Sequence, residues 1–150
     1  DGGYIIAGQT VWGGAQWETE SDVYLIKTDA NGNELWEKEF GGDMTDIGYY
    51  AEQTSEGGYI ISGFTASFEG LDTVYLIKTD ANGNKVWEKI FEGTSGLSNP
   101  ISVHQTSDSG YIISAGNKEG KDTQNIQPGS PLYGSGNDAY LIKTDENGDV

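Results

Sequence analysis

The chain has 150 residues, with 24 Asp or Glu against 8 Lys or Arg, so its formal net charge at neutral pH is -16. A protein this acidic repels phosphate backbones, which argues against a nucleic-acid partner. Cysteine is absent, which excludes disulfides, thiol nucleophiles and zinc sites built on sulfur, and no apolar run is long enough to span a membrane. The 23 glycines, the 3 prolines and the many Tyr, Ile, Val and Thr residues favour strands joined by tight turns.

Two phrases each occur three times along the chain. Gly-Gly-Tyr-Ile-Ile, with Ser as its first residue in the last copy, begins at Gly2, Gly57 and Ser109. Tyr-Leu-Ile-Lys-Thr-Asp-x-Asn-Gly, followed by Asn or Asp, begins at Tyr24, Tyr75 and Tyr140. A period of roughly 50 residues is typical of propellers and other repeat architectures. We therefore divide the single segment 1–150 into three repeats, approximately 1–45, 46–96 and 97–150.

The middle repeat is complete and predicts four short antiparallel strands. Their predicted ranges are 46–54, 59–65, 73–79 and 85–91. Gly57 and Gly58 supply the positive φ angles of a tight hairpin between the first two strands, and Asn82-Gly83 is a typical hairpin turn between the last two. Four antiparallel strands in about 50 residues are the unit of one β-propeller blade.

The other two repeats lack one strand each. With strands lettered a to d from the centre of a propeller outward, the chain runs b, c, d, then a full set, then a, b, c. The predicted fold is all-β, with about three propeller blades of four antiparallel strands, the first lacking strand a and the last lacking strand d. Strand d mixes charges with Trp36 or Trp87, which suits an outer edge strand whose Trp closes its blade. Open blade edges indicate either a segment of a longer polypeptide, which we favour, or copies that complete one another's blades.

The connections between strands b and c differ in length and composition, unlike the tight turns at the other end of each strand. These connections cover 9–22, 66–72 and 117–138. Variable loops on a rigid scaffold often carry recognition, and four aromatic residues in these loops are candidate ligand-binding residues: Trp12, Trp17, Phe68 and Tyr133. Exposed rings could stack on sugars or anchor a protein, whereas rings that fold back would cap the blade ends.

The phrase Asp-x-Asn-Gly-[Asn/Asp] places oxygen donors at alternate positions, as the first half of a calcium loop does. The nine residues concerned are Asp29, Asn31, Asn33, Asp80, Asn82, Asn84, Asp145, Asn147 and Asp149. The spacing of the glycine and of the later residues departs from an EF-hand, so we favour a turn in which Asp caps its own backbone. Calcium remains the alternative, and the sequence indicates no other cofactor.

No catalytic motif stands out. His104 is the single histidine and is expected to line a channel on an inner strand. A nucleophile elbow, a phosphate-binding loop and a dinucleotide fingerprint are all missing from the sequence. One group of carboxylates is predicted to form a solvated acidic rim: Glu18, Glu20, Asp22, Asp43 and Asp46.

The repeat resembles the β-propeller repeats of secreted and surface-attached bacterial and archaeal proteins, in which Gly-Gly-Tyr-Ile-Ile-x-Gly and Tyr-Leu-Ile-Lys-Thr-Asp-x-Asn-Gly-Asn-x-x-Trp recur. The resemblance spans essentially the whole chain. It implies an extracellular or cell-surface setting, usually within a larger polypeptide, and a binding or display role without catalytic residues. The order of Asp29, Gly32 and Trp36 is more distantly similar to the tryptophan-docking repeats of quinoprotein dehydrogenases, although Asn31 stands where those repeats have Thr and the spacings are one residue short.

The sequence thus predicts a non-enzymatic, extracellular β-propeller scaffold that binds a glycan or a protein through its variable loop face. One alternative is a structural protein that assembles into a ring or filament by blade completion between chains. Another is a propeller enzyme, either quinoprotein-like or a lyase or hydrolase that acts in the channel.

Overall fold

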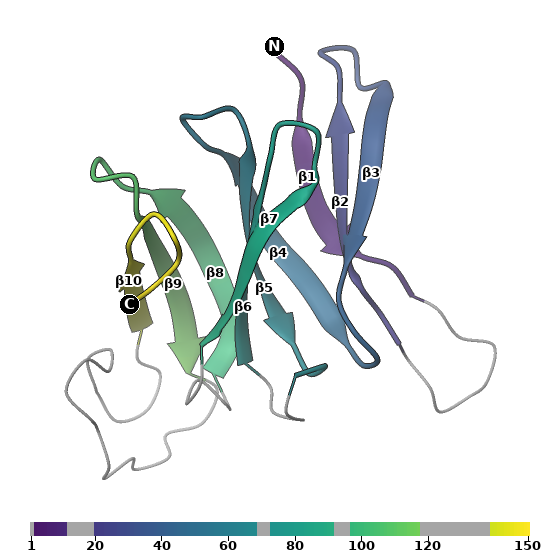
Figure 1. Cartoon of the computed structure of the whole chain (residues 1–150). Coiled ribbons are helices and arrows are strands. Elements are labelled where there is room, and N and C mark those ends of the chain that lie inside the picture. Colours follow the sequence, from purple (N-terminus) through teal and green to yellow (C-terminus); the bar gives the residue numbers. More distant parts are fainter. Residues whose placement is uncertain (1, 12–19, 69–72, 92–96, 118–138) are drawn as a thin grey trace, which may run out of the picture.

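The structure is a computed structural model in which we describe residues 2–11, 20–68, 73–91, 97–117 and 139–150. Every regular element in this part of the chain is a β-strand, and the strands form three antiparallel sheets (Figure 1). The predicted all-β class is therefore confirmed. Within the same residues, no helix is long and apolar enough to cross a bilayer.

The strands divide among the sheets as the repeats predict. The first sheet contains β1 (Ile5–Gln9), β2 (Val23–Thr28) and β3 (Glu34–Phe40), in that order. The middle sheet contains β4 (Asp46–Gln53), β5 (Tyr59–Thr65), β6 (Thr73–Thr79) and β7 (Lys85–Phe91). The third sheet contains β8 (Leu97–Gln105), β9 (Tyr111–Asn117) and β10 (Ala139–Thr144). Each strand pairs with its neighbour in sequence, so every sheet is a simple meander.

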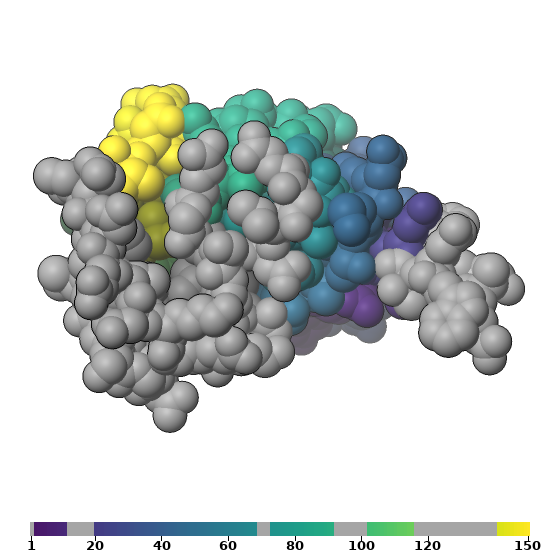
Figure 2. Space-filling model, turned by 90° about the horizontal axis from the view of Figure 1, so that it is seen from below, coloured from purple at the N-terminus to yellow at the C-terminus, as the bar shows by residue number. Residues whose placement is uncertain are grey.

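The three sheets stack face to face in chain order. Figure 1 shows the green third sheet, the teal middle sheet and the purple-to-blue first sheet side by side. In the view from below, the yellow C-terminal residues and the purple N-terminal residues lie at opposite sides of the teal middle sheet (Figure 2). The middle sheet is therefore covered on both faces, whereas the first and third sheets are each covered on one.

Two apolar cores fill the spaces between the sheets. The core between the first and middle sheets contains Val23, Leu25, Phe40, Tyr59, Ile61, Tyr75 and Ile77. The core between the middle and third sheets contains Ile60, Val74, Leu76, Phe91, Val103, Tyr111, Ile113, Ala115 and Ile142. Alternate residues of β5 and β6 thus point into different cores, which is why these strands are apolar without interruption.

The glycine pair before β5 meets two separate backbone requirements. Gly57 has a φ of 89°, which a residue with a side chain rarely adopts. A Cβ on Gly58 would lie 2.2 Å from the carbonyl oxygen of Thr79, so the strands can approach this closely only with glycine there. The last repeat has Ser109 in place of the first glycine, and Ser109 keeps the positive φ, at 66°.

The stack has two unlike ends. The tight turns between β2 and β3, β4 and β5, β6 and β7, and β8 and β9 lie at the upper end in Figure 1. The connection from β3 to β4, the end of β7, the start of β8, and the ends of β1, β5 and β9 that lead into the variable connections lie at the lower end (Figure 1). We call these the turn end and the loop end.

Candidate functional site

At the turn end, each Asp-x-Asn-Gly phrase forms a turn that its own Asp stabilises. The Asp80 Oδ1 atom accepts hydrogen bonds from the backbone N–H groups of Asn82 and Asn84, each at 2.8 Å, and Oδ2 accepts one from the Asn84 side-chain amide at 2.9 Å. Asp29 makes the equivalent contacts, and the Asp145 carboxylate accepts the backbone N–H groups of Asn147 and Asp149.

These hydrogen bonds hold the pKa of all three aspartates below the ordinary value. For Asp29 and Asp80 the largest cause is the amide of the Asn four residues later, and for Asp145 it is the backbone N–H of Asp149. The predicted turn accounts for these oxygen atoms with protein donors. Among the described residues, no three acidic or histidine side chains come together as a metal site. Calcium binding at these turns stays a prediction.

A lysine in each repeat caps the strand that precedes the turn. Lys27, Lys78 and Lys143 each donate a hydrogen bond from Nζ to the carbonyl oxygen of the following Thr, at 2.7, 3.2 and 2.8 Å. Lys78 also donates to the Thr54 Oγ1 atom at 2.9 Å. Burial lowers the pKa of Lys78.

The tryptophan of each outer strand contacts the next sheet. The Trp36 ring meets Tyr59 edge to face, with centroids 5.6 Å apart, and Trp87 meets Tyr111 in the same way at 5.8 Å. A Cβ on the turn glycine of the next sheet would lie 2.8 Å from Trp36 at Gly83, and 3.0 Å from Trp87 at Gly148. Both rings therefore join neighbouring sheets. The sequence analysis had instead predicted that each tryptophan closes the blade to which it belongs.

A lysine two residues after each of these tryptophans reaches the same turn. The Lys38 Nζ atom lies 3.4 Å from the Asn84 Oδ1 atom, and the Lys89 Nζ atom lies 2.6 Å from the Asp149 Oδ1 atom. The contact between the first and middle sheets and the contact between the middle and third sheets are thus built from equivalent residues.

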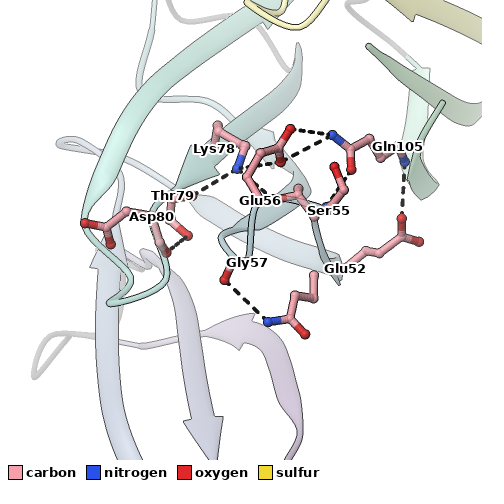
Figure 3. A network of polar contacts seen from close by, with 10 residues as sticks. Glu52, Ser55, Glu56, Gly57, Lys78, Thr79, Asp80 and Gln105 are labelled. Carbon is pink, nitrogen blue, oxygen red and sulfur yellow. Dashed lines mark hydrogen bonds and ion pairs between the residues drawn. The ribbon is translucent and has the colours of Figure 1, made fainter. Parts of the chain in front are cut away.

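A polar network crosses from the middle sheet to the third sheet at the turn end (Figure 3). Gln105 of β8 donates its backbone N–H to Glu52 at 3.2 Å and its side-chain amide to Glu56 at 3.1 Å, and it accepts the Ser55 N–H at 2.8 Å. Glu56 in turn lies 4.0 Å from the Lys78 Nζ atom.

The single histidine belongs to the same region. The His104 Nδ1 atom lies 2.6 Å from the Glu52 Oε2 atom, and the imidazole meets the Tyr50 ring edge to face at 5.4 Å. His104 is exposed at this contact between sheets. The geometry gives His104 a role in joining β4 and β8.

A cleft of about 420 Å³ opens beside this network. Its lining includes Glu56, Lys78, Trp87, Tyr111, Glu146 and Asn147. Aromatic rings, carboxylates, an amide and an amine in one cleft can bind a polar ligand. Three of these groups already have partners in the protein, because Glu56 binds Gln105, Lys78 binds Thr54, and Trp87 packs on Tyr111.

At the loop end, two carboxylates from neighbouring sheets face each other. Asp46 is fully buried; its Oδ2 atom accepts hydrogen bonds from Gly42 N at 2.9 Å and Ser67 Oγ at 2.6 Å, while its Oδ1 atom has no hydrogen-bond partner among the described residues. A Cβ on Gly41 would lie 2.1 Å from the Asp22 Oδ1 atom and 2.6 Å from the Asp46 Oδ2 atom. Burial raises the pKa of Asp22, and the charges of Asp46 and Glu20 raise it further.

The predicted solvated rim is therefore wrong for Asp46, because that side chain is covered where the first and middle sheets meet. Glu20 and Asp43 are exposed, as a rim requires. Glu18 lies outside the described residues.

The structure describes one of the four candidate ligand-binding aromatics. Phe68 is partly buried and its ring lies 5.7 Å from that of Tyr75, so it covers the core between the first and middle sheets. Trp12, Trp17 and Tyr133 lie outside the described residues. No protein-family model matches the chain, and no curated protein has a similar sequence.

Proposed function

We propose that the three sheets are blades of a β-propeller and that the chain is a non-enzymatic scaffold which binds a glycan or a protein at its loop end. We also propose an extracellular or cell-surface location, which the resemblance to secreted propeller repeats implies. The observation that carries the proposal is the contact between sheets, because it occurs twice with equivalent residues.

A repeated contact of this kind is what a repeat scaffold requires. Trp36 on Tyr59 and Gly83, and Trp87 on Tyr111 and Gly148, fix each sheet on the next in the same way. Repeat proteins derive their shape from such a constant step between neighbours, and propeller blades of four strands are packed around an axis by it.

The two ends of the stack differ in what they leave for a ligand. At the turn end, the polar groups of the Asp80 turn bond to one another, Lys78 binds Thr54 and Glu56 within the middle sheet, and Glu56 accepts a hydrogen bond from Gln105 of the third sheet. At the loop end, the connections vary among the repeats in length and composition, and the sequence places Trp12, Trp17 and Tyr133 in them. Variable loops on a constant framework favour recognition at that end.

The test is retention of the chain on a glycan array and on immobilised extracellular proteins. We expect the double variant Trp17→Ala and Tyr133→Ala to lose retention while its melting temperature stays that of the parent chain. The control is Leu35→Ala, an exposed residue near the turn end, which should be retained as well as the parent. Equal retention of the double variant and the parent would reject binding through the loop end.

A further inference from the structure

Asp22 and Asp46 come together because two segments run side by side at the loop end. Ser21, just before β2, forms an isolated parallel bridge with Thr45, just before β4. The Asp46 N–H donates to the Ser21 carbonyl oxygen at 2.6 Å, and the Ser21 N–H donates to that of Met44 at 3.4 Å. Each aspartate directly follows a bridged residue, so the backbone fixes both of them where the first and middle sheets meet.

The absence of a side chain at Gly41 leaves room for the two carboxylates. A Cβ there would lie 2.1 Å from the Asp22 Oδ1 atom and 2.6 Å from the Asp46 Oδ2 atom, so both oxygen atoms occupy the space that a side chain would need. None of the ion pairs formed among the described residues includes Asp22 or Asp46. The two carboxylates therefore face each other without a lysine from the described protein to compensate their charge.

Asp46 provides the second observation, which points to a ligand. Its side chain is fully buried, and the two donors that reach it, the Gly42 N–H and the Ser67 hydroxyl, both bind Oδ2. The Oδ1 atom is also buried and has no hydrogen-bond partner among the described residues. Buried charges in proteins are paired or coordinate metal ions, and carboxylates that bind metals are themselves held by hydrogen bonds. The Asp46 carboxylate is held through one oxygen and keeps the other available.

The scaffold itself does not require this pair of acids. The contact between the middle and third sheets repeats the tryptophan contact between the first and middle sheets. The sequence nevertheless has Ser98 in the third repeat where the middle repeat has Asp46. Because one sheet can pack on the next without an acid at this position, packing alone does not account for a buried carboxylate there.

We propose that Asp22 and Asp46 bind one calcium ion at the loop end, between the first and middle sheets. Calcium prefers oxygen ligands and combines carboxylates with carbonyl oxygens and water. Two carboxylates are fewer than the three acidic or histidine side chains that would form a site by themselves, so carbonyl oxygens and water complete the coordination. The ion compensates both charges and joins the two sheets. The Asp-x-Asn-Gly turns lie at the other end of the stack and are a separate candidate.

The experiment combines isothermal titration of the full chain with calcium chloride and melting curves in calcium or in EGTA, at constant ionic strength. We expect one calcium ion per chain and a higher melting temperature in calcium, because an ion bound only by the folded state stabilises that state. Asp22→Asn keeps the size of the side chain but removes a charged ligand, so the calcium affinity should fall by roughly tenfold or more. Asp43→Asn, which removes an exposed charge, should bind calcium like the parent chain.

The melting curves in EGTA show whether each variant is folded. Asp22 is only partly buried, and Asp22→Asn should melt in EGTA at or slightly above the temperature of the parent chain. A parent chain that neither binds calcium nor melts at a higher temperature in calcium would overturn the proposal. So would Asp22→Asn that binds calcium as tightly as the parent, which would place the ion elsewhere, for example at the Asp-x-Asn-Gly turns. Neither result bears on glycan or protein binding, because calcium is the only ligand in the experiment.

Discussion

Aspartates at the turn end and at the loop end of the stack lie in opposite electrostatic environments. At the turn end, Asp29, Asp80 and Asp145 each accept hydrogen bonds from N–H groups, and the pKa of each lies below its ordinary value. At the loop end, Asp22 faces the buried Asp46 and its pKa is raised. The comparison teaches that the turn end is arranged for stability, whereas the loop end holds charge that the described protein atoms do not compensate. Uncompensated charge of this kind is more typical of functional sites than of structural ones.

The largest expected effect tests how rigid the turn end is. Gly58→Ala places a Cβ 2.2 Å from the Thr79 carbonyl oxygen, so the strands must separate, at a cost of roughly 2 to 3 kcal/mol in the free energy of unfolding. Gly8→Ala is the matched control, since a Cβ there meets no atom within 4 Å. Denaturant titration of both variants measures the difference. Equal denaturation midpoints for the two variants would mean that the strands at the turn end can separate at little cost in free energy.

The next effect tests the hydrogen bonds of the turn. Asp80→Ala removes the acceptor for the N–H groups of Asn82 and Asn84, so we expect a lower melting temperature at neutral pH. Because the folded pKa of Asp80 is lowered, its stabilising contribution is present above 3.8, the ordinary value, and is lost as pH falls through the folded pKa. The difference between variant and parent should therefore shrink in acid. A difference that is constant with pH would contradict the pKa argument.

At the loop end, in the absence of calcium, we expect removal of an aspartate to change the melting temperature in the opposite direction. Asp22→Asn removes a carboxylate whose folded pKa is raised, so at neutral pH it should increase the melting temperature slightly. The penalty is present while Asp22 is ionised and disappears as pH falls toward 3.8, so the gain should disappear there too. Asp43→Asn, at an exposed position, is the control and should change little. A loss of stability in Asp22→Asn at neutral pH would contradict this argument, because it would mean that the Asp22 carboxylate makes a net stabilising contact.

The smallest effect concerns one residue of the third sheet's turn. Ser109 has a φ of 66°, a conformation that costs a residue with a side chain more than it costs glycine. Ser109→Gly should therefore stabilise the chain by about 0.5 kcal/mol, after the larger entropy of glycine in the unfolded chain is subtracted. Thermal unfolding would detect this change. A destabilised variant would indicate that the Ser109 side chain makes a contact worth more than the strain.

The sequence predicted the parts of the fold that local chemistry determines. Gly57 and Asn82-Gly83 mark turns by their own backbone preferences, and the four strands between and beside them were predicted to within one residue. β4 ends one residue early, at Gln53, because the next residue already belongs to the turn: Thr54 accepts the Gly57 N–H at 2.9 Å.

Contacts between sheets were harder to predict, because they depend on which faces meet. A tryptophan recurs in the outer strand at a constant spacing after Asn-Gly, as Trp36 and Trp87. This regularity could have indicated that both rings make the same contact, but the partners of each ring belong to the next repeat. The third repeat has Ser98 where the middle repeat has Asp46, so no repeated aspartate in the sequence could indicate that Asp46 is buried. The ligand-binding roles of Trp12, Trp17 and Tyr133 remain predictions from the sequence.

The two-sided burial of the middle sheet also has a consequence for unfolding. A sheet that contacts its neighbours through two cores loses both only if the whole stack comes apart, whereas an outer sheet can detach by losing one. Opening should therefore begin at the first or third sheet. The amide protons of β5 and β6 should exchange with solvent last, at a rate that reports the stability of the whole array rather than of one repeat.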